Sequence, residues 1–124
     1  MDVTPIIPSD RQLIESYGDG QFRVSGVVFQ GPVLVFPDHS AEWSVRTFEE
    51  LSIEDFRPVV TAEPQVEILL LGSGPKMGLL PGRLRRELRA AGVVVDVMDT
   101  GAACRTYNIL LSEARRVAAA LLPV

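Results

Sequence analysis

The sequence predicts an α/β fold in which an antiparallel β-rich first half and a C-terminal βαβα unit form one domain. Two observations lead to this prediction. Short apolar stretches separated by glycine and proline turns fill the first half, whereas a continuous apolar run followed by helical periodicity begins the second. With 124 residues, 47% of them hydrophobic, the chain has the size and composition of one globular domain spanning residues 1–124.

The N-terminal half is expected to be antiparallel, because strands this close in sequence pair most simply through tight turns. Gly18-Asp19-Gly20 can supply the positive φ angles of a hairpin turn. The expected strands are residues 13–17, 22–24, 27–29, 33–36 and 42–45, the last of which carries Trp43.

The second half is expected to form a βαβ unit. Ser52 and Asp55 resemble the start of a helix that Pro58 keeps short. Residues 66–71 and 93–98 are apolar enough for buried strands, and residues 81–91 between them have helical periodicity and end before Gly92. A crossover of this kind places the two strands parallel in one sheet.

The last element is expected to be a single helix over residues 102–121. At about 100° per residue, one apolar face would contain Tyr107, Leu110, Leu111, Ala114, Val117, Ala118 and Leu121. The two apolar strands and this helix face together predict burial of Leu69, Leu71, Val93, Val95, Val97, Leu110, Ala114 and Val117.

Composition excludes several function classes. A single cysteine, Cys104, and a single histidine, His39, cannot form the Cys/His sets that hold zinc, and no cofactor is expected. The net charge of −4 argues against nucleic-acid binding. The N-terminus resembles no targeting peptide, and no apolar run approaches the roughly 20 residues of a transmembrane helix, so a cytoplasmic location is expected.

A candidate ligand site lies where loops follow the two parallel strands. Ligands of open α/β sheets bind at such strand ends, and helix N-termini there can donate N–H groups to anions. The predicted ligand-binding residues are Gly72, Ser73, Gly74, Lys76, Thr100, Cys104, Arg105 and Asn108. The glycine spacing fits neither a dinucleotide fingerprint nor a P-loop, so a purely structural turn is the alternative.

Three features near this site each allow two interpretations. Cys104 in the first turn of a helix could be an activated thiol, but no base is predicted nearby, and a buried structural role is the alternative. Asp99 and Thr100 are expected to cap the last helix. The arginine-rich outer face of the helix at 81–91 is either solvated or a partner contact.

The sequence also resembles a known family. The stretch from Asp99 to Asn108, Glu113-Ala114-Arg115-Arg116-Val117, Ala119-Ala120-Leu121-Leu122-Pro123 and the strand-loop from Leu69 to Gly74 resemble a family of single-domain proteins of unknown function. This family includes a mitochondrial respiratory complex I assembly factor. The resemblance implies a three-layer α/β fold, with a central mixed sheet, the C-terminal βαβα unit and an additional N-terminal antiparallel β layer, which agrees with the pattern of the residues. It implies no established catalytic set.

Two function hypotheses follow from the residues and the resemblance. The first is a non-enzymatic interaction or assembly factor with a protein partner, for which a respiratory-complex subunit or assembly intermediate is the candidate and a homo-oligomer is compatible. The alternative is a small-anion or small-ligand binding protein or enzyme that uses the strand-end cleft. A closed, packed junction at the strand ends would favour the first hypothesis, and a polar cavity would favour the second.

Overall fold

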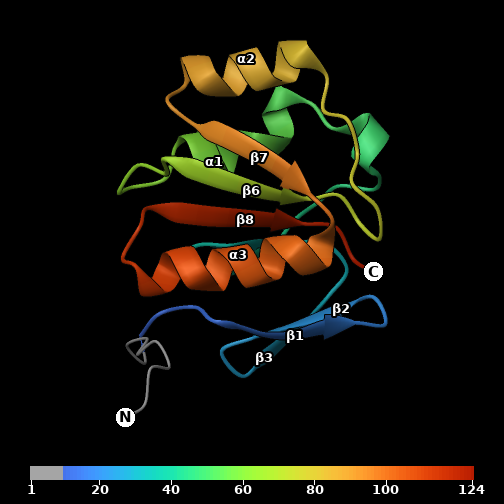
Figure 1. The fold of residues 1–124 in the computed structure, drawn as a ribbon, viewed down its shortest axis with the longest axis vertical. Helices are drawn as coiled ribbons and strands as arrows, with labels where there is room; N and C mark the ends of the chain where they lie inside the picture. The colour runs from blue at the N-terminus through green and yellow to red at the C-terminus, as the bar shows by residue number, and fades with distance from the viewer. Residues whose placement is uncertain (1–9) are drawn as a thin grey trace.

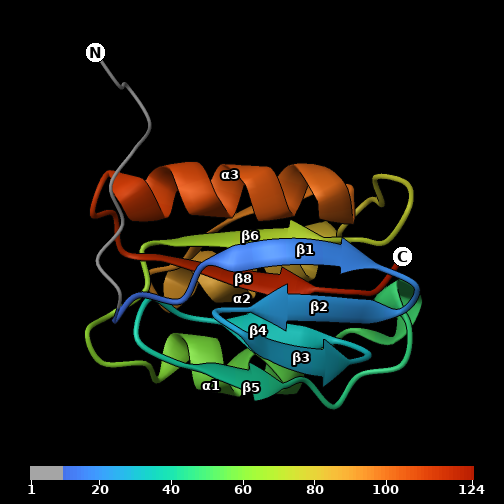
Figure 2. The same cartoon turned by 90° about the horizontal axis from the view of Figure 1, so that it is seen from below.

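The computed structural model describes residues 10–124. A central five-stranded sheet separates two layers, as Figures 1 and 2 show. Helices α1 (Arg57–Val60) and α2 (Gly82–Ala90) cover one face of the sheet. Helix α3 (Thr100–Ser112) and a small three-stranded sheet lie side by side on the other face. The predicted three-layer α/β class is therefore confirmed.

The small sheet is antiparallel, as expected for the N-terminal half. Its order is β1 (Ile14–Gly18), β2 (Gln21–Val24) and β3 (Val27–Gln30). Phe22 and Val24 are fully buried from this sheet and pack toward the central sheet and α3. Alternation of buried and exposed residues along β2 gives the sheet one apolar and one solvated face.

The central sheet has the order β5-β4-β8-β6-β7. Its strands are β4 (Val33–Val35), β5 (Ser40–Glu42), β6 (Ile68–Gly72), β7 (Val94–Met98) and β8 (Val117–Leu121). β6 runs parallel to both β7 and β8, whereas β4 is antiparallel to β8 and β5. The predicted parallel pairing of the strands that flank α2 is confirmed.

The expected single helix over residues 102–121 is wrong in its second half. All five residues of β8 are buried, and the strand lies at the centre of the sheet between β4 and β6. A strand covered on both faces is apolar at every position, so the helical phase assigned to Val117, Ala118 and Leu121 was coincidental. The C-terminal unit is therefore βαβαβ, one strand longer than expected.

Helix α3 ends in a Schellman motif. The Arg115 N–H donates to the Leu110 carbonyl, and the Ala114 N–H donates to the Leu111 carbonyl. Ala114 holds φ at 60°, in the left-handed region where glycine is usual. As a consequence Ala114 is exposed and Leu110 only half-buried, contrary to expectation, whereas the other six residues predicted to be in the core are buried.

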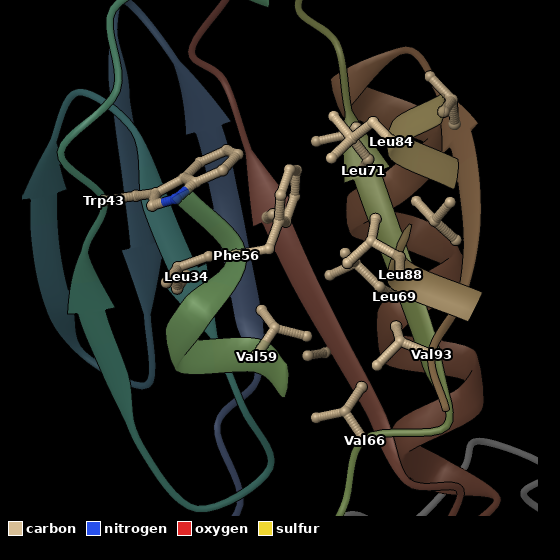
Figure 3. Packing of buried hydrophobic residues seen from close by; sticks show 14 of the residues in the cluster. Leu34, Trp43, Phe56, Val59, Val66, Leu69, Leu71, Leu84, Leu88 and Val93 are labelled. Carbon is tan, nitrogen blue, oxygen red and sulfur yellow. The ribbon is translucent and has the colours of Figure 1, made fainter. Parts of the chain in front are cut away.

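Trp43 lies just after β5 rather than inside a strand over residues 42–45. The strand begins earlier because the Phe36 N–H donates to the His39 carbonyl and closes a tight turn. The Trp43 ring packs against Phe56 at 5.5 Å between centroids, and its Nε1 donates to the Asp55 carbonyl at 2.8 Å. Figure 3 shows both rings in the apolar cluster between the central sheet and the helices.

The segment between β5 and β6 contains the short helical stretch that was expected to begin near Ser52. Two 3-10 turns, η1 (Phe48–Glu50) and η2 (Ile53–Phe56), precede α1. The Asp55 carboxylate accepts a hydrogen bond from the Ser52 N–H at 2.9 Å, which fixes the start of η2. The fully buried side chains of Phe56 and Val59 anchor this segment on the central sheet.

Candidate functional site

The loops after β6 and β7 meet at the start of α3, as the sequence predicts, and hydrogen bonds close the junction. Thr100 is fully buried. Its hydroxyl accepts from the Gly74 N–H at 2.9 Å and donates to the Leu122 carbonyl at 2.7 Å. The Thr100 N–H donates in turn to the Gly74 carbonyl at 2.8 Å. Thr100 therefore ties together three segments: the loop after β6, the start of α3 and the end of β8.

The two glycines of this loop meet packing and conformational requirements. A Cβ atom on Gly72 would lie 3.0 Å from both the Thr100 Cα and the Leu121 side chain, which is tighter than nearly all real contacts. Gly74 has φ +99°, a conformation that other residues rarely adopt. These contacts favour the structural interpretation of the glycines, because both are explained without a ligand.

Ser73 organises the turn that follows. Its hydroxyl accepts from the Gly78 N–H at 3.0 Å and donates to the Lys76 carbonyl at 2.6 Å. Lys76 is exposed on this turn. The serine hydroxyl therefore has internal partners, and the only charged side chain of this loop, Lys76, is presented to solvent.

The N-terminus of α3 has little capacity left for an anion. Asp99 caps the helix, as predicted, by accepting from the Ala102 N–H at 2.9 Å through its carboxylate. The Thr100 and Ala103 N–H groups donate to the carbonyls of Gly74 and Asp99. The Tyr17 hydroxyl lies over the same end, 2.5 Å from where a Cβ on Gly101 would sit. A negatively charged ligand would have to displace the Asp99 carboxylate or the tyrosine.

The remaining predicted residues lie in a shallow groove between α3 and β1. The Asn108 Oδ1 accepts from the Ile14 N–H at 3.0 Å, and its Nδ2 donates to the Ile14 carbonyl at 2.8 Å. Asn108 thus bonds the edge of β1 as a neighbouring strand would. Arg105 is exposed and donates to the Tyr17 hydroxyl at 3.3 Å. The groove is lined by these residues together with Cys104 and the β1 backbone region.

Cys104 is a buried residue of the core rather than an activated thiol. Only 3% of it is exposed, in the cluster that joins α3 to the central sheet. Burial raises the pKa of the thiol from 9.0 to about 12, which outweighs the lowering by neighbouring Arg105. Because α3 begins at Thr100, the cysteine lies beyond the first turn, where the helix dipole is most effective. The thiol therefore stays protonated at neutral pH.

The structure thus divides the predicted site into two parts. Gly72, Ser73, Gly74 and Thr100 form the closed junction, with Lys76 on its outer turn. Cys104, Arg105 and Asn108 line the groove on the other side of α3. Ligand binding by either part stays a prediction, and the closed junction favours the interaction-protein hypothesis.

A pocket that the sequence did not predict lies at the opposite end of the central sheet, where β6 and β8 begin. Its volume is about 160 Å³. Buried Phe36, Leu111 and Val117 form an apolar floor, while Arg11 and Arg115 lie at its rim. His39, stacked on Phe36 at 4.4 Å, also lines it. The segments that meet here are far apart in sequence, so only the tertiary fold reveals the pocket.

Two further findings concern the described part of the chain. Among residues 10–124 there is no group of three or more His, Cys, Asp or Glu side chains that could hold a metal ion. In the same residues, no helix has both the length and the apolar character needed to cross a membrane.

Residues 14–122 match a protein-family model described as "Protein of unknown function (DUF498/DUF598)". The chain belongs to this family. The matched region runs from the start of β1 to just past β8, so it includes the junction, the groove and all of the pocket lining except Arg11. The resemblance seen in the sequence is thereby confirmed.

Among named relatives of this family member, proteins called "NADH dehydrogenase (ubiquinone) 1 alpha subcomplex assembly factor 3" recur. The one from Danio rerio is 38% identical over 111 residues, and the one from Homo sapiens is 32% identical over 110 residues. The matches cover about 90% of this chain but 64% and 60% of those relatives, which is less than two thirds of their length. An uncharacterised Rhodobacter capsulatus protein is 40% identical, with 84% of its length covered.

Solved structures share the fold of this family member. A crystal structure from Bordetella parapertussis has a TM-score of 0.84 at 37% identity and covers 92% of this chain and 97% of its own. A solution structure from Bordetella pertussis, described as a Mth938-like domain, has a TM-score of 0.81 at 32% identity, with coverages of 99% and 92%.

Proposed function

We propose that this protein is a non-enzymatic assembly factor that binds a subunit or an assembly intermediate of the respiratory NADH:ubiquinone oxidoreductase. The observation that carries the proposal is the similarity of residues across the α/β domain to relatives named as assembly factors for that complex. In this proposal the partner contact is made by the domain that this chain shares with those longer relatives.

The arrangement of the candidate site supports a binding role over an enzymatic one. The hydroxyls of Ser73 and Thr100 have internal partners, and the Cys104 thiol is buried with a raised pKa. The alternative small-ligand function would need an open polar cavity at the strand ends. The contacts there are instead backbone and side-chain hydrogen bonds within the chain. A cytoplasmic location is part of this proposal.

The test is deletion of the gene in its host, provided that the host carries the complex. Assembled NADH:ubiquinone oxidoreductase should fall several-fold on native gels, while the level of an unrelated respiratory complex should not change. A tagged copy of the protein should restore assembly and co-purify with subunits of the complex. Normal assembly in the deletion strain would contradict the proposal.

Two substitutions separate the proposal from the small-ligand alternative. Arg105→Ala removes the exposed guanidinium of the groove, and Cys104→Ala removes the thiol. If the protein acts by binding a partner elsewhere, both variants should restore assembly once their expression matches that of the parent protein. Failure of the folded Arg105→Ala protein alone would instead indicate that the groove contributes to the activity.

A further inference from the structure

The two sheets have four edge strands, and three of them are protected against pairing with another chain. The β1 edge is bonded by Asn108 from α3. At the β7 edge, the Arg85 guanidinium donates a hydrogen bond to the Val95 carbonyl at 2.9 Å. The β5 edge is only three residues long and ends in charged Glu42. Short strands, charges and covering side chains are the usual ways in which proteins prevent edge-to-edge association.

Strand β3 is also short, at four residues, but it has neither a charged residue nor a side chain bonded to its edge. Its residues Val27–Gln30 include no charge and no proline, and it lies at the outer edge of the small sheet (Figure 2). Val27 and Val28 are 55% and 50% exposed. Two exposed valines on an open, uncharged edge strand are the features that favour addition of a further strand.

The hydrogen-bond phase of β3 identifies the backbone groups that face outward. Ser25 and Gly26 both have positive φ, as in a two-residue type I′ turn, so Val24 and Val27 form a hydrogen-bonded pair. The bond from the Gly31 N–H to the Gly20 carbonyl, at 2.8 Å, confirms this alternation. The N–H and carbonyl groups of Val28 and Gln30 therefore point away from β2.

We propose that β3 pairs with β3 of a second copy of this chain, in antiparallel orientation about Phe29. Val28 of each copy would then lie opposite Gln30 of the other, and the outward N–H and carbonyl groups of both residues would be satisfied. The half-buried Phe29 side chains would meet at the two-fold axis. One antiparallel sheet would continue across both molecules.

The lack of charge on β3 favours a second copy of this chain as its partner, and the small area of the strand limits how tightly the two copies bind. Because β3 is uncharged and Arg23 on the neighbouring strand is paired with Glu15 at 3.5 Å, the antiparallel arrangement brings no unpaired like charges into contact. The outward N–H and carbonyl groups belong to Val28 and Gln30, two residues apart. Two antiparallel copies of this edge can therefore pair residue 28 of one with residue 30 of the other. A four-residue strand buries far less than the roughly 1,600 Å² of a standard interface, so the dimer is weak and concentration-dependent.

Sedimentation equilibrium and amide exchange of the full chain test the proposal. We expect a reversible dimer at high protein concentration, and slower exchange of the Val28 and Gln30 amides as concentration rises. Val28→Pro removes an N–H that β2 does not use, so the monomer should fold while dimerisation weakens at least tenfold. Val28→Thr keeps the N–H and the side-chain shape, and should dimerise like the parent protein.

Two results would overturn the proposal: a monomer at every concentration, or a dimer in which exchange at Val28 and Gln30 is independent of concentration. The first would leave the edge available to a strand of another protein, and the second would place the dimer contact elsewhere. The exchange measurement uses the unaltered chain, so the test does not depend on the folding of the proline variant.

Discussion

At the scale of single residues, Thr100 was predicted as a ligand contact, but its hydroxyl is used in hydrogen bonds within the fold. The sequence identified it as a cap or a ligand contact at the start of a helix. Its two hydroxyl partners, the Gly74 N–H and the Leu122 carbonyl, belong to segments 26 and 22 residues away. The Asp99 cap was predictable because its partner lies three residues along the chain. The role of Thr100 was not, because Leu122 follows a strand that the sequence had assigned to a helix.

We expect Thr100→Val to lower the free energy of unfolding by about 2–6 kcal/mol. The isosteric valine leaves one buried N–H and one buried carbonyl without a partner, and each unsatisfied group costs about 1–3 kcal/mol. Thr100→Ser keeps the hydroxyl and serves as the matched control, with a clearly smaller loss. Urea unfolding followed by circular dichroism measures both. A valine variant as stable as the serine variant would show that the hydroxyl does not hold the junction.

At the scale of elements, the parts of the fold that carry local signals were predictable. Proline before α2 and glycine after it gave nearly correct bounds for that helix and its flanking strands. The boundary between α3 and β8 has no such signal, because Ala114 occupies the left-handed position where glycine would have ended the helix. The alanine-rich β8 also has high helix propensity, and only burial between β4 and β6 makes it a strand.

Asn108 connects two elements, and its loss should loosen one from the other. We expect Asn108→Ala to destabilise the protein by about 1–3 kcal/mol, because both polar groups of Ile14 lose their side-chain partner. Amide exchange should increase most in β1 and at its hairpin with β2. Ile109→Ala is the control on the same helix, since Ile109 is 56% exposed. Equal exchange in the two variants would argue against a connecting role for the asparagine.

At the scale of the whole molecule, α3 joins the central sheet to the small sheet through a shared apolar cluster. The cluster contains two ionisable side chains, Cys104 and Tyr107, which are 3% and 0% exposed. The Tyr107 hydroxyl donates to the Gln12 carbonyl at 2.9 Å. Burial raises the pKa of Cys104 from 9.0 to about 12 and raises the pKa of Tyr107 above its ordinary value of 10.0. The free energy of unfolding should therefore depend on pH in the alkaline range, where these two groups ionise in the unfolded chain.

We expect the free energy of unfolding to fall as pH rises from about 9 toward about 12. Below this range both the folded and the unfolded chain keep these protons, so the two groups add no pH dependence. Above pH 9 the unfolded chain releases the thiol proton while the folded chain retains it. Stability then decreases by up to about 1.4 kcal/mol per pH unit for each such group.

Urea unfolding at successive pH values measures the slope. Cys104→Ala should flatten it between about pH 9 and 10, before the unfolded Tyr107 ionises, and an unchanged slope there would show that the thiol is not the linked group.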